Sequence, residues 1–343
     1  MKKARLDKWD YYKLFLICCV VIGHIGNYYA ASSPPLARVQ FWVYLFHMPA
    51  FIFVSGLFSK KTVDGRKWSR AVPYLFIFIL MKALQYAVSI AVYGFEKSSL
   101  VLFTEEGVPW YALAMFFFIG TTILVRNVHP AYVLSVSAAI SLISGYTASL
   151  GGFLALQRTV IFYPFFYLGY LIDTEKFTAF TNKLWVRIAS VPVVAASAVF
   201  VYLKYDDIKF WRDLFRGIFL YNEITDKYSP IWGFSWRLAF YAISLIMIVC
   251  TVSLMPTFRS FIAGMGSRTL PVFVLHYPVI VYMVMKVKWF RNWFSSGHVA
   301  LHSALFCLVL VVVLSLPVFD YPIRKIMRVP ARKKKEAVEK GVE

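Results

Sequence analysis

The sequence predicts an all-α fold, a polytopic membrane helix bundle with about ten transmembrane helices and both termini in the cytoplasm. Hydrophobic residues make up 60% of the 343 positions, well above the share of about 45–50% in soluble domains. Aromatic residues make up 19% of the chain, and tryptophan and tyrosine gather at both interfaces of a bilayer. Apolar segments of about 17–25 residues, the length that crosses a bilayer, recur along most of the chain.

Ten apolar segments have the length needed to cross a membrane as helices. The first is followed by no small-residue cleavage site, so we expect the chain to keep it as an anchor. The fifth is rich in small residues and the sixth contains Arg158 and Pro164, so these two fit the pattern least well. In order, the ten segments are 11–31, 38–58, 71–94, 109–126, 130–149, 153–172, 185–204, 232–254, 269–287 and 298–318.

The basic residues are distributed unevenly along the chain, whose formal net charge is +20. If the N-terminus is inside, most of the 37 lysines and arginines lie on the cytoplasmic side, including the clusters at 60–70 and 332–340. This positive-inside bias sets both termini in the cytoplasm of a multi-pass cell-membrane protein. Contact with anionic membrane lipid explains such clusters, and we expect no nucleic-acid partner.

The longest connection, at about 205–231, has an amphipathic pattern. Phe210, Trp211, Leu214 and Phe215 follow helical spacing, and charged residues lie opposite them. The pattern predicts a surface-lying connector at the outer leaflet, where an interfacial helix would show such a face. A rim or lid over an outward-facing site is the functional alternative.

The first apolar segment carries a stripe of polar residues. Lys13 and His24 are eleven residues apart, which is close to three helical turns, so they share one face about 16 Å apart. Asp10 lies one turn before Lys13, and Asn27 one turn beyond His24. Ionisable groups inside a bilayer almost always face a bundle interior or a wet cavity. A hydrogen bond to a neighbouring helix is the structural alternative for His24.

Other segments place ionisable residues at a similar depth. His47 lies near the middle of the second segment, Lys82 about eleven residues into the third, and His276 in the ninth. A shared depth predicts a buried functional chamber rather than scattered structural polar groups. Arg70 opens the third segment from the inside, and Arg158 starts the sixth from the outside.

A metal site is not expected. His298 and His302 form an H-x-x-x-H pair, but no third ligand of matching register is visible. The four cysteines lie inside apolar segments and lack both disulfide-framework and zinc spacing.

Motifs along most of the chain, from Asp10 to about Pro322, resemble those of the membrane-bound acyltransferase 3 family, in particular its fucose 4-O-acetylase-like branch. These are a basic residue ten positions before a histidine (Lys13 and His24), "FHMPAFIFVSGLFSKK" at 46–61, Arg70 with Pro73 and Tyr74, "WYALAMFF", "PFFYLGYLI" and "GSRTLPVFVLHYPVI". The sequence departs from the family pattern at Lys13, where arginine is commoner, at Leu14, where many relatives have glycine, and at Ala112, where leucine is usual.

The resemblance implies a ten-helix O-acyltransferase. Its domain would span 1–322, followed by a basic cytoplasmic tail at 323–343. Family members take an acyl group, commonly acetyl, from a cytoplasmic donor, here expected to be acetyl-CoA as co-substrate. They transfer it to a sugar hydroxyl of an envelope polysaccharide or its lipid-linked precursor. The acceptor sugar and the oligomeric state stay open.

Residue types and their depth suggest a role for each candidate. We expect His24, His47 and His276 to be catalytic, because an imidazole near neutrality can take the proton of an attacking hydroxyl. His24 is the favoured base; His47 or His276 is its partner or a second acid/base, and covalent transfer through a histidine is an alternative. The expected CoA-binding residues are Lys13, Arg70 and Lys60, which form a cationic mouth, and Asp10 beside Lys13. The expected residues on the sugar side are Lys82, Arg158, Trp110 and Glu105.

Two other classes of protein fit part of the pattern. Mid-membrane histidine and lysine also suit a proton-coupled secondary transporter of a small polar solute. Transporters often show repeated halves, and no such symmetry stands out in this sequence. A non-enzymatic scaffold or lipid-binding partner would not depend on the histidines.

Overall fold

In the computed structural model, the chain folds as a bundle of helices. The structure describes residues 7–104, 107–147, 151–224, 229–258 and 260–327. Within these ranges the regular elements are helices, and an isolated bridge between Thr104 and Phe153 is the strand-like pairing. The predicted all-α class is therefore confirmed.

The α-helices follow one another with short connections, several of them single 3-10 turns. One such turn, η2 (Trp68–Arg70), leads into α5. The bounds are α1 Asp7–Tyr29, α2 Pro34–Tyr44, α3 His47–Leu57, α4 Lys60–Val63, α5 Val72–Tyr93, α6 Trp110–Val125, α7 Pro130–Ile143, α8 Leu156–Leu171, α9 Thr174–Thr181, α10 Leu184–Ile208, α11 Arg212–Arg216, α12 Gly233–Ser253, α13 Phe261–Gly266, α14 Thr269–Lys286, α15 Lys288–Phe294 and α16 Val299–Leu314.

Each of the ten predicted crossing segments contains a helix, but these helices differ in length. By length and composition, six helical stretches in the described residues are long and apolar enough to cross a membrane. A bent pair, Val299–Leu314 with Pro317–Met327 at 62°, would make a seventh. The six are Asp7–Ser32, Pro34–Leu57, Trp68–Tyr93, Leu184–Arg216, Pro230–Ser253 and Thr269–Lys286. A polytopic helix bundle is thus supported.

The remaining three predicted spans are shorter helices. α6 and α8 have 16 residues each, and α7 has 14. At 1.5 Å per residue, 16 residues extend about 24 Å, less than the apolar core of a bilayer, which is about 30 Å thick. The count of ten spans and the cytoplasmic side of the termini therefore stay predictions.

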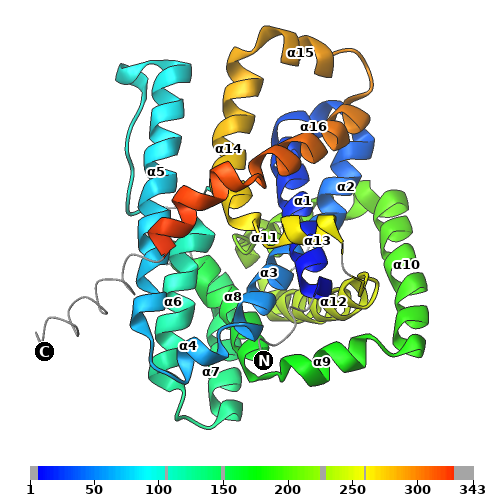
Figure 1. Cartoon of the computed structure of the whole chain (residues 1–343). Coiled ribbons are helices and arrows are strands. Elements are labelled where there is room, and N and C mark those ends of the chain that lie inside the picture. Colours follow the sequence, from blue (N-terminus) through cyan, green and yellow to red (C-terminus); the bar gives the residue numbers. More distant parts are fainter. Residues whose placement is uncertain (1–6, 105–106, 148–150, 225–228, 259, 328–343) are drawn as a thin grey trace, which may run out of the picture.

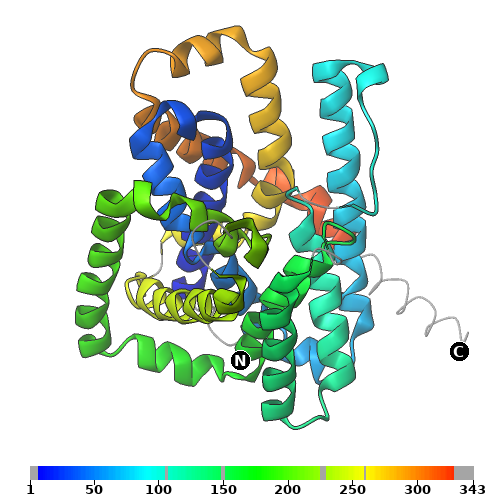
Figure 2. The same cartoon turned by 180° about the vertical axis from the view of Figure 1, so that it is seen from behind.

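α1 lies inside the bundle, in contact with α2, α3, α13, α14 and α16. It begins near α4 and α9 at one end of the molecule, here called the α9 end, and runs toward the opposite end, where α15 lies (Figure 1). Trp9 and Tyr12 fix its first turns, because the Trp9 indole donates to Thr178 Oγ1 at 3.0 Å and the Tyr12 hydroxyl is 2.9 Å from Thr251 Oγ1. Seen from behind, the green α10 forms the left edge of the bundle (Figure 2).

α3 and α8 cross with their backbones in close approach. A Cβ on Gly56 would lie 2.0 Å from the Phe166 carbonyl oxygen, and one on Gly169 would lie 2.1 Å from that of Phe53. Both distances are far below van der Waals contact, so glycine is required on each helix. This crossing fixes α3, which carries His47 at its first residue.

The second long stretch is broken between α2 and α3. Pro49 explains the break, because proline has no N–H to pair with the carbonyl of Leu45 four residues earlier, and its ring clashes with that carbonyl. The Ser244 hydroxyl of α12 donates to the Leu45 carbonyl instead, at 2.8 Å. The His47 ring pairs with the Val43 carbonyl at 2.8 Å. The Ser244 side chain thus satisfies a carbonyl that the broken helix leaves open, as apolar surroundings require, and His47 adds a second hydrogen bond to the Val43 carbonyl, which also accepts the Phe46 N–H at 3.3 Å.

The prediction of a surface-lying connector at about 205–231 is wrong for the described part of that segment. Leu214, Phe215, Phe219 and Tyr221 are buried in the main hydrophobic core. The segment is amphipathic, as its apolar spacing predicts, but its apolar face packs against α2 and α12 rather than against lipid.

Candidate functional site

A cavity of about 110 Å³ lies between α1, α3, α5, α6 and α14. It follows α1 from Ile17 to His24, a length of about 10 Å at 1.5 Å per residue. Its polar lining comes from four rings and a hydroxyl: His24, Tyr74, Trp110, Tyr111 and Thr269. The apolar lining comprises Ile17, Val20, Met48, Phe51, Val108, Leu270 and Phe273.

His24 and His276 meet beside this cavity. Their ring centroids are 5.2 Å apart, and the Tyr277 ring packs edge-on to His24 at 5.4 Å. His24 lines the cavity, whereas His276 has no exposed surface. The two histidines predicted from distant helices therefore do come together.

The ring of His276 is held by its own helix. Its Nδ1 lies 2.9 Å from the Val272 carbonyl and 3.0 Å from that of Phe273. A carbonyl can only accept, so Nδ1 carries the proton. Nε2 is buried and has no hydrogen-bond partner. His276 thus presents a free lone pair inside the bundle.

His47 lies nearby but does not line the cavity. Its Nδ1 donates to the Val43 carbonyl, and its ring stacks on Tyr44 with centroids 5.1 Å apart. Its neighbour Met48 does line the cavity. The geometry therefore favours His47 as a support of the broken helix, and its predicted catalytic role stays a prediction.

Three polar residues near the histidines were missed from the sequence. Gln40 is buried and donates to the Gly23 carbonyl at 2.8 Å. Tyr111 shares a 2.7 Å hydrogen bond with Ser55 at the cavity wall. Tyr44 contacts both Gly23 and His47. The sequence did contain a signal for Gln40, because it is a polar residue inside an apolar segment. Nothing in the local sequence distinguishes Tyr44 and Tyr111 from the other tyrosines of the chain.

Lys13 and Asp10 form an ion pair at the α9 end of the site. Lys13 Nζ lies 2.7 Å from Asp10 Oδ1, and the Asp10 side chain is nearly buried. Lys13 is one helical turn before Ile17, where the cavity begins. The cavity therefore lies along α1 between Lys13 and His24.

Lys60 and Arg70 are exposed in the segment joining α3 to α5. Lys61, Arg66 and Lys67 of the same segment are exposed as well. This group of cations lies at the α9 end, outside the cavity. One further arginine, Arg268, directly precedes the cavity residue Thr269 at the start of α14.

Trp110 and Arg158 lie together on the α6–α8 side. Trp110 lines the cavity, and the Arg158 guanidinium stands over its ring at 5.3 Å from the centroid. Arg158 is buried and donates to the Gly107 carbonyl at 3.3 Å. Arg158 thus contacts the cavity residue Trp110 and does not itself line the cavity.

Lys82 is buried on α5, away from the cavity lining. Its Nζ donates to the Thr104 carbonyl at 3.0 Å. Glu105 falls outside the described residues, so its predicted place on the sugar side is not addressed by the structure. The structure brings Lys82 to the segment that leads into α6, not to His24.

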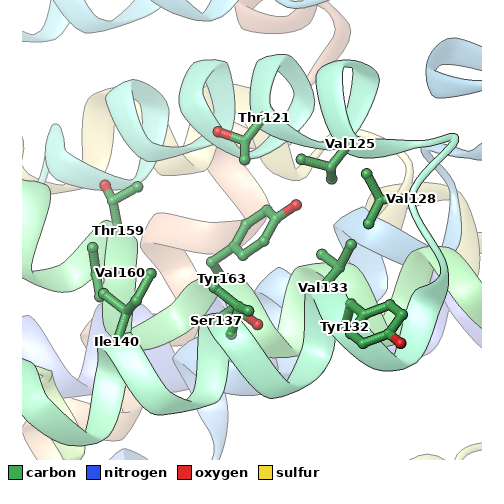
Figure 3. A pocket seen from close by; sticks show the side chains of 11 residues that line it. Thr121, Val125, Val128, Tyr132, Val133, Ser137, Ile140, Thr159, Val160 and Tyr163 are labelled. Atoms are coloured by element: carbon green, nitrogen blue, oxygen red, sulfur yellow. The ribbon is translucent and has the colours of Figure 1, made fainter.

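Two larger cavities carry no ionisable side chain suited to acid–base chemistry near neutrality. One of about 350 Å³ lies between α6, α7 and α8 (Figure 3), and its hydroxyl residues are Thr121, Tyr132, Ser137, Thr159 and Tyr163. The other, of about 470 Å³, is lined by apolar and aromatic side chains of α2, α10, α11 and α12, with Ser197 its one hydroxyl residue. Volume alone would favour either, but the chemistry favours the smaller cavity at His24.

In the described part of the chain, no group of three histidine, cysteine, aspartate or glutamate side chains is placed to hold a metal ion. The cavity has the His24 imidazole at one end, with His276 behind it, and Lys13 lies near the other end. Such a site can take a proton from a hydroxyl and can hold an anionic group nearby. The fold and site together define a membrane-type helical bundle with a cavity lined by His24.

The chain belongs to the acyltransferase 3 family: the profile of that family, described as an acyltransferase domain, matches residues 6–319. This confirms the family resemblance carried by the motifs. No solved structure matches the chain.

Two similar curated proteins are both nodulation protein NolL. The one from Mesorhizobium japonicum (strain LMG 29417 / CECT 9101 / MAFF 303099) is 28% identical over 182 residues, which cover 48% of this chain and 46% of the relative. The one from Sinorhizobium fredii (strain NBRC 101917 / NGR234) is 27% identical over 183 residues, covering 48% and 47%. The match thus spans about half the length of these relatives.

Proposed function

We propose that the protein is an integral membrane O-acyltransferase. It moves an acyl group, in the main acetyl, from acetyl-CoA on the cytoplasmic side to a sugar hydroxyl of a cell-envelope or exopolysaccharide, or of its lipid-linked precursor. The single observation that carries the proposal is the cavity that runs along α1 from near Lys13 to His24, with His276 behind it. Family membership supports acyl transfer as the type of reaction.

The chemistry requires a base and a way for the donor to approach. The sugar oxygen forms a bond to the thioester carbonyl carbon while its proton passes to an imidazole nitrogen. The carbon–sulfur bond then breaks, and CoA leaves as a thiolate that takes up the proton. The His24–His276 pair provides imidazoles suited to this transfer near neutral pH.

The donor side is the α9 end. CoA carries several phosphate charges, and the exposed cations around Lys60 and Arg70, with Lys13 deeper in, would attract them. The narrow cavity between Lys13 and His24 suits the thin acyl-pantetheine arm. The volume of about 110 Å³ is below the engineered cavity of about 150 Å³ that admits benzene, which favours a small acyl group such as acetyl.

The acceptor side is the opposite half of the site. Trp110, with Arg158 stacked against it, offers an aromatic and a cationic surface at the cavity. We assign sugar contact to this pair, and a supporting role to Lys82 and Glu105. The proposal places both termini in the cytoplasm of a multi-pass protein of the cell membrane, surrounded by lipid.

A direct test is transfer of radiolabelled acetyl from acetyl-CoA to crude envelope glycan by the purified protein. His24→Ala should abolish transfer while CoA binding stays measurable. His298→Ala, an exposed histidine outside the cavity, is the matched control and should retain full transfer. Wild-type transfer by His24→Ala would contradict the proposed site. Substrate uptake into proteoliposomes without release of CoA thiol would instead indicate a transporter.

A second measurement identifies the product. The mass of envelope glycan from cells with and without the gene should differ by one acetyl group per modified sugar. Identical masses under conditions of expression would count against a polysaccharide acceptor.

A further inference from the structure

Gln40 links the second helix to the polar stripe of α1. Its side-chain nitrogen lies 2.8 Å from the Gly23 carbonyl and 2.9 Å from Asn27 Oδ1. Gln40 has 1% of its surface exposed. A Cβ on Gly26 would lie 2.7 Å from the Gln40 amide carbon, so α1 has no side chain there and the amide can approach.

The direction of these hydrogen bonds is fixed by the main chain. A backbone carbonyl only accepts, so the group of Gln40 that faces Gly23 is the NH₂ and not the oxygen. The same NH₂ faces Asn27, which must therefore offer its oxygen to Gln40. The Asn27 NH₂ is left to face His24, where it lies 3.4 Å from Nδ1.

These hydrogen bonds determine the tautomer of His24. Because an amide NH₂ can only donate, Nδ1 of His24 must accept, and the proton of the neutral ring sits on Nε2. His47 and His276 have the opposite tautomer, since Nδ1 of each donates to a carbonyl of its own helix. His24 is thus an N–H donor at Nε2, beside a His276 ring whose Nε2 has a lone pair and no partner.

We propose that Gln40 and Asn27 are positioning residues that set a two-imidazole proton relay. This rests on the proposed acyl transfer. The attacking hydroxyl gives its proton to Nδ1 of His24, displacing the long contact to Asn27. His24 then passes its Nε2 proton to Nε2 of His276. This step needs the two rings to turn toward each other, because the two nitrogens are not hydrogen-bonded in the structure. At the same time the sugar oxygen bonds to the thioester carbon. When the carbon–sulfur bond breaks, the thiolate takes the proton back from the pair.

The surroundings of the two rings fit this direction. Asn27 is exposed, so an acceptor arriving from that side meets Nδ1 of His24 first. His276 is completely buried, which suits a group that contacts only its partner ring. Two carbonyls at its Nδ1 stabilise the positive charge that it would carry for a moment.

The tautomers can be read without any enzyme assay. Solid-state ¹⁵N NMR of the full-length protein in lipid bilayers, labelled at its six histidines, distinguishes Nδ1–H from Nε2–H. We expect Nε2–H for His24 and Nδ1–H for His47 and His276, assigned with single histidine variants. Finding His24 as Nδ1–H in the unaltered protein would overturn the proposal.

Two substitutions at Gln40 give opposite signatures. Gln40→Leu removes the shorter hydrogen bond to Asn27 Oδ1 and leaves only the longer one from the Tyr44 hydroxyl, at 3.4 Å, so His24 should show mixed tautomers. Gln40→Glu offers only acceptors when its carboxylate is ionised, and Asn27 should then turn its oxygen to His24 and reverse the tautomer to Nδ1–H. In the protonated form the carboxyl group can still donate to the Gly23 carbonyl, and the tautomer should stay as in the unaltered protein. Both should lower kcat between about tenfold and 10⁴-fold, as when the group that orients a catalytic ring is lost. The KM for acetyl-CoA should stay within about twofold, because Lys13 and the donor end are untouched.

Gln157→Leu is the matched control, since it is the same change at a buried glutamine of α8 whose side-chain nitrogen has no partner. It should leave kcat and all tautomers unchanged. If His24→Ala loses activity but Gln40→Leu keeps an unchanged kcat, the proposed relay is wrong. The proposed acyltransferase function would still stand. Full activity in His24→Ala would instead remove the proposed function itself.

Discussion

The rings of His24 and His276 lie 5.2 Å apart, although nearly three quarters of the chain separates the two residues in sequence. α1 and α14 pack against each other along this contact. His24 reaches the cavity, and His276 stays behind it with an unpartnered Nε2. A small rotation of the two rings would let them share one proton, so the pair can be tested as a unit.

We expect the two histidines to be strongly non-additive. His276→Asn keeps a donor near the Val272 carbonyl but removes Nε2, so it should lower kcat by about 10²-fold or more, within the range of general acid–base catalysis. Adding it to His24→Ala should cause little further loss, because groups that act as a unit lose their effect together. The measurement is kcat for acetyl transfer in a double-mutant cycle. Independent, multiplying losses would show that the rings do not share a proton.

Much of the fold could be predicted because hydropathy and segment length are local properties. The helix around His24 and the stripe from Asp10 to Asn27 follow from spacing alone. The break before His47 could have been found, since Pro49 removes the partner of the Leu45 carbonyl. The burial of Phe215 could not, because an amphipathic face looks the same whether protein or lipid covers it.

The site was only partly predictable for a similar reason. A shared depth in the membrane brought His24, His47, His276 and Lys82 into one predicted chamber, but depth does not fix direction around a helix. The structure turns Lys82 toward Thr104 and leaves His47 on Tyr44. The chemistry of each residue was visible in the sequence, whereas its partner depended on helix packing.

Lys13 should control affinity for the donor rather than the chemical step. Lys13→Ala should raise the Kd for CoA by about tenfold, because a charge-assisted contact to phosphate is worth about 1.5–3 kcal/mol. Lys13→Arg should restore binding, since arginine also holds phosphate. Calorimetry at low and high salt checks this, and the difference between variants should shrink as salt screens the charges.

The control for Lys13 is Lys204→Ala at the far end of α10. Lys204 is exposed and pairs with Asp207 at 3.5 Å. Its loss should leave CoA affinity unchanged. An equal loss of affinity in both variants would mean that only net charge matters and that Lys13 has no specific place in the donor site.

Asp173 gives α9 a defined pH dependence. Its Oδ1 accepts the backbone N–H groups of Lys176 and Glu175, both at 2.9 Å. The pKa of Asp173 lies below its ordinary value. The main cause is the hydrogen bond from the Lys176 N–H; the bond from the Glu175 N–H and the positive charges of Lys176 and Lys60 act in the same direction. Because the folded pKa is depressed, the stabilisation is present above the unfolded pKa of about 3.9 and is lost as the pH falls through the folded value.

Asp173→Asn is the matched variant, because asparagine caps a helix without titrating. Melting temperatures of both proteins between pH 2.5 and 7 check the prediction. The advantage of the wild type over Asp173→Asn should be largest at neutral pH and shrink once the pH falls below about 4. A constant difference across the range would show that the carboxylate charge does not contribute to the cap.

Phe51 and Met48 should set the size of the acyl group. Both lie on α3 and line the cavity of about 110 Å³ beside His24. Phe51→Ala would open space for a longer chain, and a methylene in an apolar pocket changes discrimination by about 10- to 200-fold. We therefore expect kcat/KM for butyryl-CoA to rise by about tenfold or more relative to acetyl-CoA, with Met48→Ala acting in the same direction.

The control is Phe76→Ala, which removes a ring of α5 that is 47% exposed and should leave the preference unchanged. If Phe51→Ala loses activity with both donors but keeps their ratio, these side chains support the helix and another wall measures the acyl group.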